Sequence, residues 1–213
     1  MMAEKSGLRG ITGEIVATDV SFEDYLEKYA ADFCEWIDGT VEKMSPIHDK
    51  HDLLTRYLAL FFEAYFDLRP IGCIRQAPFV MRLPTIGRSR EPDLQVILNN
   101  NTHTLTSTYM DGPANICIEV VSPESVQRDH GAKFEEYEKG GVPEYWLLDP
   151  IRSDTHFYRI NASNVYVAHQ PDEAGNYQSP QLPGLLLHVP TLWMTPLPGF
   201  MTIGEAVRQM LNA

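Results

Sequence analysis

A carboxylate stands in the middle of a short apolar segment. Residues 116–121 read Ile-Cys-Ile-Glu-Val-Val, a run rich in β-branched residues that is typical of a buried strand. Side chains alternate between the two faces of a strand, so Glu119 shares a face with Cys117 and Val121. An ionised carboxylate is costly to bury unless it is paired or binds a metal ion. The segment therefore predicts a buried strand with a charged or metallic partner beside Glu119.

The chain before this strand predicts two helices and a hairpin. Ser21 is a typical helix N-cap residue, so a short helix is expected after it. Asp38-Gly39 stands between two short strand-like runs, which is a strong hairpin signal. Apolar residues at helical spacing predict a long amphipathic helix over residues 49–67. Strands are expected over 71–82 and 91–98, with a loop between them.

The chain after this strand predicts a second long helix, more strands and a terminal helix. The long helix is expected over 124–139, and the strands over 144–148, 155–160 and 164–169. Thr202-x-x-Glu205 has the pattern of a capping box that begins the terminal helix.

This order of elements predicts the α/β (α+β) class, with a mixed central β-sheet flanked by helices. We expect an N-terminal extension over residues 1–20, one domain over 21–195 and a C-terminal tail helix over 196–213.

Composition limits the classes of function. The chain of 213 residues has 17 Lys and Arg against 29 Asp and Glu, a formal net charge of −12. This charge disfavours binding to nucleic acid by general attraction, because such binding depends on basic side chains that displace counterions. The apolar runs fall short of the ~20 residues that cross a bilayer, so no membrane partner is expected. Three scattered cysteines and the lack of a visible signal peptide are typical of a cytoplasmic protein.

Two carboxylates and a lysine are expected to converge near the end of the Glu119 strand. Asp93 opens the preceding predicted strand and could face the same cleft. In the following helix, Asp129, Lys133 and Tyr137 are spaced four residues apart and share one face. A lysine from the first turns of that helix could reach the carboxylates. Such a set suits Mg²⁺-dependent hydrolysis of a phosphodiester, because Mg²⁺ is held by one or two carboxylates plus waters.

Plainer interpretations of the same residues stay open. Glu119 could accept hydrogen bonds or an arginine at a sheet edge, and Asp129 with Lys133 could form a weak surface ion pair. Tyr137 and Trp146 fit a role as core aromatics.

Five motifs follow one another along the chain in a fixed order. They are Ile-Asp-Gly-Thr-Val-Glu-Lys-Met-Ser-Pro at 37–46, Glu-Pro-Asp-Leu at 91–94, Glu-Val-Val-Ser-Pro-Glu at 119–124, Asp129 with Lys133 and Tyr137, and Gly-Val-Pro-Glu-Tyr-Trp-Leu-Leu-Asp-Pro at 141–150. Together they closely resemble the Uma family of putative restriction endonucleases, which belongs to the PD-(D/E)XK nuclease-like superfamily. The resemblance covers residues 20–195, most of the chain.

The resemblance implies a restriction-endonuclease-like fold and a Mg²⁺- or Mn²⁺-dependent endonuclease that acts on DNA. Asp93 matches the acid of the Pro92-Asp93 element, and Glu119 matches the acid of the (D/E)XK element, which makes both of them metal ligands. The superfamily's lysine would follow the second acid by two residues, where this chain has Val121. In this family the lysine role has moved to the following helix, so Lys133 is the candidate catalytic lysine.

Four further residues are candidates around this centre. Glu42 on the hairpin resembles the additional acid that superfamily members place near the metal. His51 could face the site beside Glu42 or cap the start of its helix. Gln95 could contact the site or form a sheet-edge hydrogen bond, and Asp129 could orient Lys133.

Partners are expected by analogy and from local charge. Restriction-type nucleases often act as dimers, so the resemblance implies a homodimer. Basic residues cluster before and around the first acid, and Arg82, Arg88 and Arg90 are the expected contacts to DNA, with Arg75 nearby. The overall acidity still predicts weak binding. The alternatives are a non-catalytic binding or assembly module that keeps the nuclease fold, or a hydrolase of another phosphodiester such as RNA.

Overall fold

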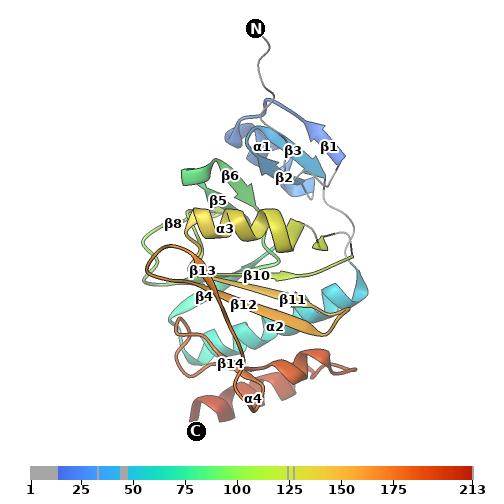
Figure 1. The fold of residues 1–213 in the computed structure, drawn as a ribbon, viewed down its shortest axis with the longest axis vertical. Helices are drawn as coiled ribbons and strands as arrows, with labels where there is room; N and C mark the ends of the chain where they lie inside the picture. Colours follow the sequence, from blue (N-terminus) through green and yellow to red (C-terminus); the bar gives the residue numbers. More distant parts are fainter. Residues whose placement is uncertain (1–13, 33, 44–47, 124, 127, 213) are drawn as a thin grey trace.

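Two large mixed sheets and the helices packed on them form the body of the protein (Figure 1). This computed structural model describes residues 14–32, 34–43, 48–123, 125–126 and 128–212. Sheet A has seven strands in the order β1-β3-β2-β6-β5-β9-β8, and sheet B has six in the order β13-β12-β11-β10-β7-β4. Each sheet contains one parallel pair among antiparallel ones, β5–β9 in sheet A and β10–β11 in sheet B. The expected mixed α+β class is confirmed, although the second large sheet was not predicted.

The strands of sheet A are β1 (Glu14–Ala17), β2 (Cys34–Ile37), β3 (Thr40–Lys43), β5 (Val80–Leu83), β6 (Arg88–Arg90), β8 (Thr104–Leu105) and β9 (Tyr109–Asp111). Those of sheet B are β4 (Gly72–Gln76), β7 (Leu94–Leu98), β10 (Ile116–Val120), β11 (Glu144–Asp149), β12 (Asp154–Ile160) and β13 (Tyr166–His169). A separate two-stranded ribbon pairs β14 (Asn176–Gln178) with β15 (Leu186–His188).

The α-helices are α1 (Phe22–Lys28), α2 (Asp49–Leu68), α3 (Phe134–Gly140) and α4 (Phe200–Asn212). A π-helical segment, η3 (Arg128–Lys133), continues directly into α3. Short 3-10 helices are η1 (Ala30–Asp32), η2 (Pro84–Ile86) and η4 (Val189–Trp193).

The Glu119 strand is buried, as predicted, and it is an inner strand of sheet B rather than an edge strand. β10 pairs with β7 on one side and with β11 on the other. Its residues Ile116, Ile118 and Val120 face the main core, where they pack with α2 and with Trp146 of β11. Cys117 and Val121 belong to the second core on the opposite face. The alternation therefore turns Glu119 away from α2 and toward α3.

Helix α3 lies between the two sheets, with α2 on the far side of sheet B (Figure 1). Tyr137 of α3 packs in one core with Cys117 and Tyr145 of sheet B and with Met81 and Leu83 of sheet A. The helix ends where Gly141 adopts a left-handed conformation with φ +81°, which a glycine accepts without steric strain. Side chains of η3 and α3 can thus reach both sheets.

The predicted hairpin is confirmed, but the predicted strand over 71–82 is wrong. Asp38 and Gly39 both have positive φ, as a tight two-residue hairpin turn requires. The 71–82 segment breaks at Pro78, which has no N–H to donate to a sheet. Its first part becomes β4 of sheet B and its second part β5 of sheet A, and the expected loop after it contains η2 and β6.

The described parts of both predicted terminal segments pack on the main body. β1, within residues 1–20, pairs with β3. In α4, Ile203 and Val207 are buried in the main core beside α2. The predicted capping box is wrong, because the helix begins at Phe200 and Thr202 lies inside it. Among the described residues no helix has the length and apolar character needed to cross a bilayer.

Candidate active site

Glu119 lies at the centre of a buried polar cluster between α3 and sheet B. Its residue surface is only 2% exposed. Lys133 Nζ donates a hydrogen bond to Glu119 Oε1 at 2.9 Å, and Tyr137 Oη donates to the same oxygen at 2.6 Å. The four-residue spacing thus brings both donors to the strand, which the sequence predicted for Lys133 alone. Tyr137 is both a core aromatic and a direct partner of the carboxylate. The sequence predicted only its place in the core.

Asp93 is fixed to the strand that carries Glu119. It lies immediately before β7, and its Oδ2 accepts a hydrogen bond from the backbone N–H of Val120 at 2.7 Å. His51 Nε2 lies 3.0 Å from the same oxygen. His51 therefore faces the site from the first turn of α2 and does not cap the helix, whose N-cap residue is His48.

Lys133 is held as an ammonium among several carboxylates. Besides its bond to Glu119, its Nζ lies 3.5 Å from Glu35 Oε1 and 3.9 Å from Asp129 Oδ1. Burial alone would lower the pKa of Lys133, but Glu119 and Glu35 raise it above its ordinary value. A protonated lysine can donate hydrogen bonds and stabilise negative charge, but it cannot accept a proton as a general base.

The two candidate metal ligands repel each other in the absence of a cation. Burial raises the pKa of Glu119 to about 7, with Lys133 opposing the shift and the charge of Asp93 adding to it. A divalent cation beside both carboxylates would remove this repulsion and favour the ionised form of Glu119.

Glu35 belongs to the cluster although it was not a predicted site residue. It is fully buried on β2 and accepts a hydrogen bond from Arg90 Nη1 at 2.6 Å. Burial alone would raise the pKa of Glu35, but Lys133 and Arg90 lower it below its ordinary value. The signal was present in the sequence, because the two-residue turn sets Glu35 directly opposite Glu42 on the same face of the hairpin.

The other predicted accessory residues take different places. Glu42 is buried on β3 beside Glu35. Asp129 is within ion-pair distance of Lys133, in keeping with a role in orienting it. Gln95 donates to the backbone carbonyl of Phe79 at 2.6 Å, so the hydrogen bond that the structure gives it goes to a loop rather than to the carboxylates.

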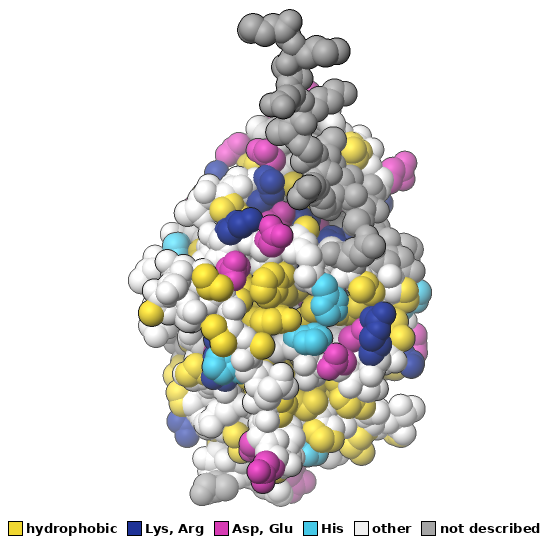
Figure 2. Space-filling model, viewed as in Figure 1, with side chains coloured by type: hydrophobic (Ala, Val, Ile, Leu, Met, Phe, Trp, Pro, Cys, Tyr) yellow, Lys and Arg dark blue, Asp and Glu magenta, His cyan; other side chains and the backbone are white. Residues whose placement is uncertain are grey.

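The three predicted DNA-contact arginines do not form an exposed basic patch. Arg90 is fully buried between Glu35 and Glu136, so it cannot reach a nucleic acid in this conformation. Arg88 pairs with Glu136 at 3.3 Å. Arg82 lies over the ring of Phe22 and 3.5 Å from Asp111. On the face shown in Figure 2, basic side chains are scattered among acidic ones.

Comparison with known proteins supplies the family. Residues 22–190 match the family named Uma2, described as "Putative restriction endonuclease". The chain belongs to this family. The comparison with curated proteins gave no match.

Among solved structures, four chains match. One is the crystal structure of "a putative nuclease belonging to DUF820 from Anabaena variabilis ATCC 29413", which is 16% identical, with a TM-score of 0.66. The match covers 82% of the Uma2 chain described here and 97% of that chain. At this identity the likeness shows the fold alone, and it confirms the expected nuclease-like fold.

The oxygen donors of this Uma2 chain suit a hard divalent cation. In the described part of the chain, no three His, Cys, Asp or Glu side chains are grouped to hold a metal. Mg²⁺ does not need such a cage, since it is usually bound by one or two carboxylates together with water and substrate phosphate. Asp93, immediately before β7, and Glu119, on the neighbouring strand β10, supply two carboxylates, and this pair fits that mode of binding.

The buried arginine offers a test of the network. Arg90→Met should lower the free energy of unfolding by about 3–5 kcal/mol, because it leaves the fully buried Glu35 without this guanidinium and also removes one partner of the partly buried Glu136. Arg88 also pairs with Glu136, but the Arg88 side chain is 27% exposed. Arg88→Met is therefore expected to lower the free energy of unfolding by less than ~1 kcal/mol. Urea unfolding at pH 7 measures both, and equal losses would contradict the assigned role of Arg90.

Proposed function

We propose that this chain is a divalent-metal-dependent nuclease that hydrolyses phosphodiester bonds in DNA. The observation that supports this best is the meeting of Asp93, Glu119 and Lys133 from three separate segments of the fold. Two carboxylates for a cation and an ammonium for phosphate charge are the groups that phosphodiester hydrolysis needs. Membership of a family described as "Putative restriction endonuclease" supports the same reaction.

Asp93 and Glu119 would hold Mg²⁺ or Mn²⁺, which when bound polarises a phosphoryl oxygen and lowers the pKa of an attacking water. Lys133, which is 1% exposed, supplies a fixed positive charge whose field stabilises the phosphoryl oxygens as negative charge develops on them, without direct contact in this conformation. The charge needs no reorganisation, because Glu35 of sheet A and Glu119 of sheet B both hold the ammonium within ion-pair distance.

Three groups position the acids. The Val120 N–H fixes one oxygen of Asp93, and Tyr137 fixes one oxygen of Glu119. Burial alone would lower the pKa of His51, but its hydrogen bond to Asp93 raises it above the ordinary value. We assign His51 as a positioning residue that holds Asp93 through this contact.

The test is a cleavage assay on the purified protein. Supercoiled plasmid, linear duplex, single-stranded DNA and RNA are each incubated with Mg²⁺, Mn²⁺, Ca²⁺ or EDTA. We expect cleavage of DNA with Mg²⁺ or Mn²⁺ and none with EDTA. Cleavage of RNA alone would overturn the DNA assignment. Lack of both metal binding and cleavage would overturn the nuclease, and would favour the non-catalytic binding or assembly module.

We also propose that the active form is a homodimer, so that two sites can act on two strands. Light scattering on the purified protein is expected to give twice the mass of the chain. A monomer that cuts both strands of a duplex would overturn this proposal.

A further inference from the structure

A hollow lies along α2, the helix that carries His51. This hollow, the α2 cavity, has a volume of about 480 Å³ and lies between α2, the turn after β11 and the segment that leads into α4. Its size is within the ~300–1,000 Å³ of typical small-molecule pockets. It is lined from three separate parts of the chain, so the fold itself forms it.

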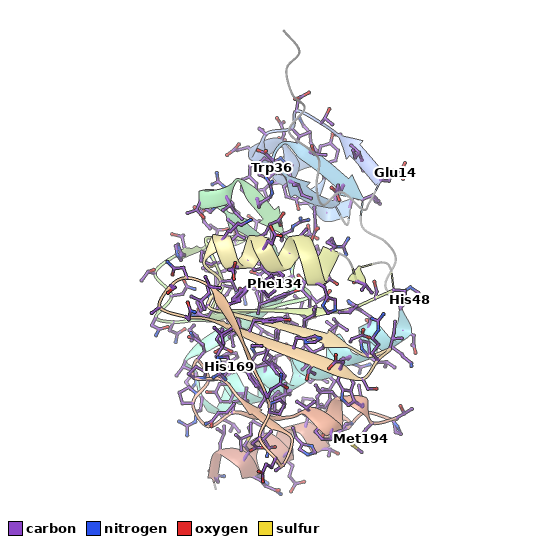
Figure 3. All side chains as sticks on the ribbon, viewed as in Figure 1. Glu14, Trp36, His48, Phe134, His169 and Met194 are labelled. Carbon is purple, nitrogen blue, oxygen red and sulfur yellow. The ribbon has the colours of Figure 1, made fainter. Side chains whose placement is uncertain are left out.

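A smaller hollow lies next to the α2 cavity and reaches His51 of the candidate active site. That hollow contains His51 and Val121, and it shares Lys50 and Pro150 with the larger cavity. His48 lines the smaller hollow and Met194 the larger one, and Figure 3 shows both labels on the same side of the molecule. A ligand that extends from His51 along α2 would therefore reach the cavity.

One wall of the α2 cavity presents aromatic and apolar side chains to solvent. Trp193 is half-buried, whereas Phe200 is 65% exposed and Met194 54% exposed. Large apolar side chains that gather at a hollow mark a binding site more often than single exposed ones do. Aromatic rings in such a position can stack on any nucleobase, because every base has a π-face.

The opposite wall supplies positive charge. Lys50 and Arg56 are exposed side chains of α2 that line the cavity. Within the described part of the chain, no carboxylate lies within ion-pair distance of either one, in contrast to Arg82, Arg88 and Arg90. In a chain with a net charge of −12, two such cations beside aromatic rings favour a ligand that is both anionic and aromatic. The smaller hollow contains Asp49 beside the shared Lys50, whereas the larger cavity is lined by Lys50 and Arg56 and by no carboxylate among the described residues.

We propose that the α2 cavity binds a nucleotide of single-stranded nucleic acid that flanks the bond to be cleaved. The base stacks on Trp193 and Phe200, and the neighbouring phosphates lie against Lys50 and Arg56. A base inside a duplex is stacked and paired, so it cannot enter without being extruded. The proposal rests on the proposed function and sharpens it, because it predicts that the preferred substrate is single-stranded or locally opened DNA.

Binding without cleavage tests this proposal separately from catalysis. A fluorescein-labelled oligothymidylate and a duplex of the same length are titrated with the protein in EDTA, and anisotropy is recorded. We expect the single strand to bind more tightly than the duplex. Trp193→Ala and Phe200→Ala should each weaken binding of the single strand by about 5- to 150-fold. Replacing both Lys50 and Arg56 with Gln should flatten the salt dependence of binding.

The controls are chosen from outside the cavity. Met201→Ala removes an even more exposed apolar side chain, at 79%, that does not line the cavity, and it should leave binding unchanged. Lys139→Gln removes an exposed lysine that does not line the cavity, and it should also leave binding unchanged. Trp193→Phe keeps an aromatic ring and should retain most of the binding, which separates stacking from loss of folding.

Each other outcome overturns the assignment. Unchanged single-strand binding in Trp193→Ala and Phe200→Ala would remove the cavity from the binding surface, whether or not the protein cleaves DNA. A wild-type dimer that Phe200→Glu splits into monomers in light scattering would make this face a contact between copies instead. A different result would contradict the proposed nuclease function alone. In that case binding still depends on the cavity residues, but no cleavage is seen at any metal concentration.

Discussion

Glu119→Gln is expected to lower the rate of DNA cleavage by about 1,000-fold or more while the protein stays folded. Glutamine has nearly the same size, and its carbonyl oxygen can still accept from Lys133 and Tyr137. It carries no charge, so it binds a divalent cation poorly. A bound metal contributes several kcal/mol to the transition state, and ~1.4 kcal/mol changes a rate tenfold. Initial rates of plasmid nicking with Mn²⁺ measure the effect.

The matched control is Glu144→Gln on the adjacent strand β11. Glu144 is also buried, but it faces the opposite side of sheet B, where Ser179 and Tyr177 donate to it. This variant should keep its cleavage rate at temperatures where it is folded. Titration calorimetry with Mn²⁺ should show binding in the control and its loss in Glu119→Gln. Full cleavage by Glu119→Gln would exclude Glu119 as a metal ligand.

Lys133→Met is expected to lower the free energy of unfolding by about 3–5 kcal/mol and to abolish cleavage. Methionine fills much of the same volume but leaves Glu119, Glu35 and Asp129 facing one another without their shared ammonium. Removing one partner from a buried ion pair has a cost of this size because the remaining charge stays buried. Urea unfolding at pH 7 measures the stability, and nicking at low temperature measures the activity of the folded fraction.

Two variants separate the structural role of Lys133 from the chemical one. Lys139→Met removes an exposed lysine of the same helix, whose partner Glu135 is also exposed, and should change neither stability nor activity. Adding Glu35→Gln to Lys133→Met reduces the unpaired charge and should recover part of the stability but none of the cleavage. Recovery of cleavage in that double variant would show that Lys133 only balances charge.

Local signals in the sequence were enough to predict most single elements. The Asp38-Gly39 pair predicted the hairpin, and helical spacing predicted α2. Strand alternation predicted which residues of β10 share a face. The same periodicities predicted that Lys133 reaches Glu119. The helix directly follows the strand in sequence, so the start of the helix lies near the end of the strand. These features depend on residues close in sequence, so a single chain reveals them.

Long-range pairing could not be predicted in the same way. Nothing local indicates that the segment broken at Pro78 sends β4 and β5 to different sheets. The packing of α4 into the main core and the burial of Arg90 between Glu35 and Glu136 also join distant segments. A run of arginines in sequence looks like a binding surface, whereas the fold pairs Arg82, Arg88 and Arg90 each with a carboxylate that a different element supplies.

The position of Lys133 between two sheets sets a limit on how this protein can be made more stable. Replacing a buried charge cluster with well-packed apolar residues often raises stability, and this cluster would be an obvious target for such redesign. Here the same ammonium that joins Glu35 of sheet A to Glu119 of sheet B is the proposed source of positive charge for the reaction. Thermostable variants that retain activity should therefore carry their changes elsewhere, in the α2 core or at surface caps.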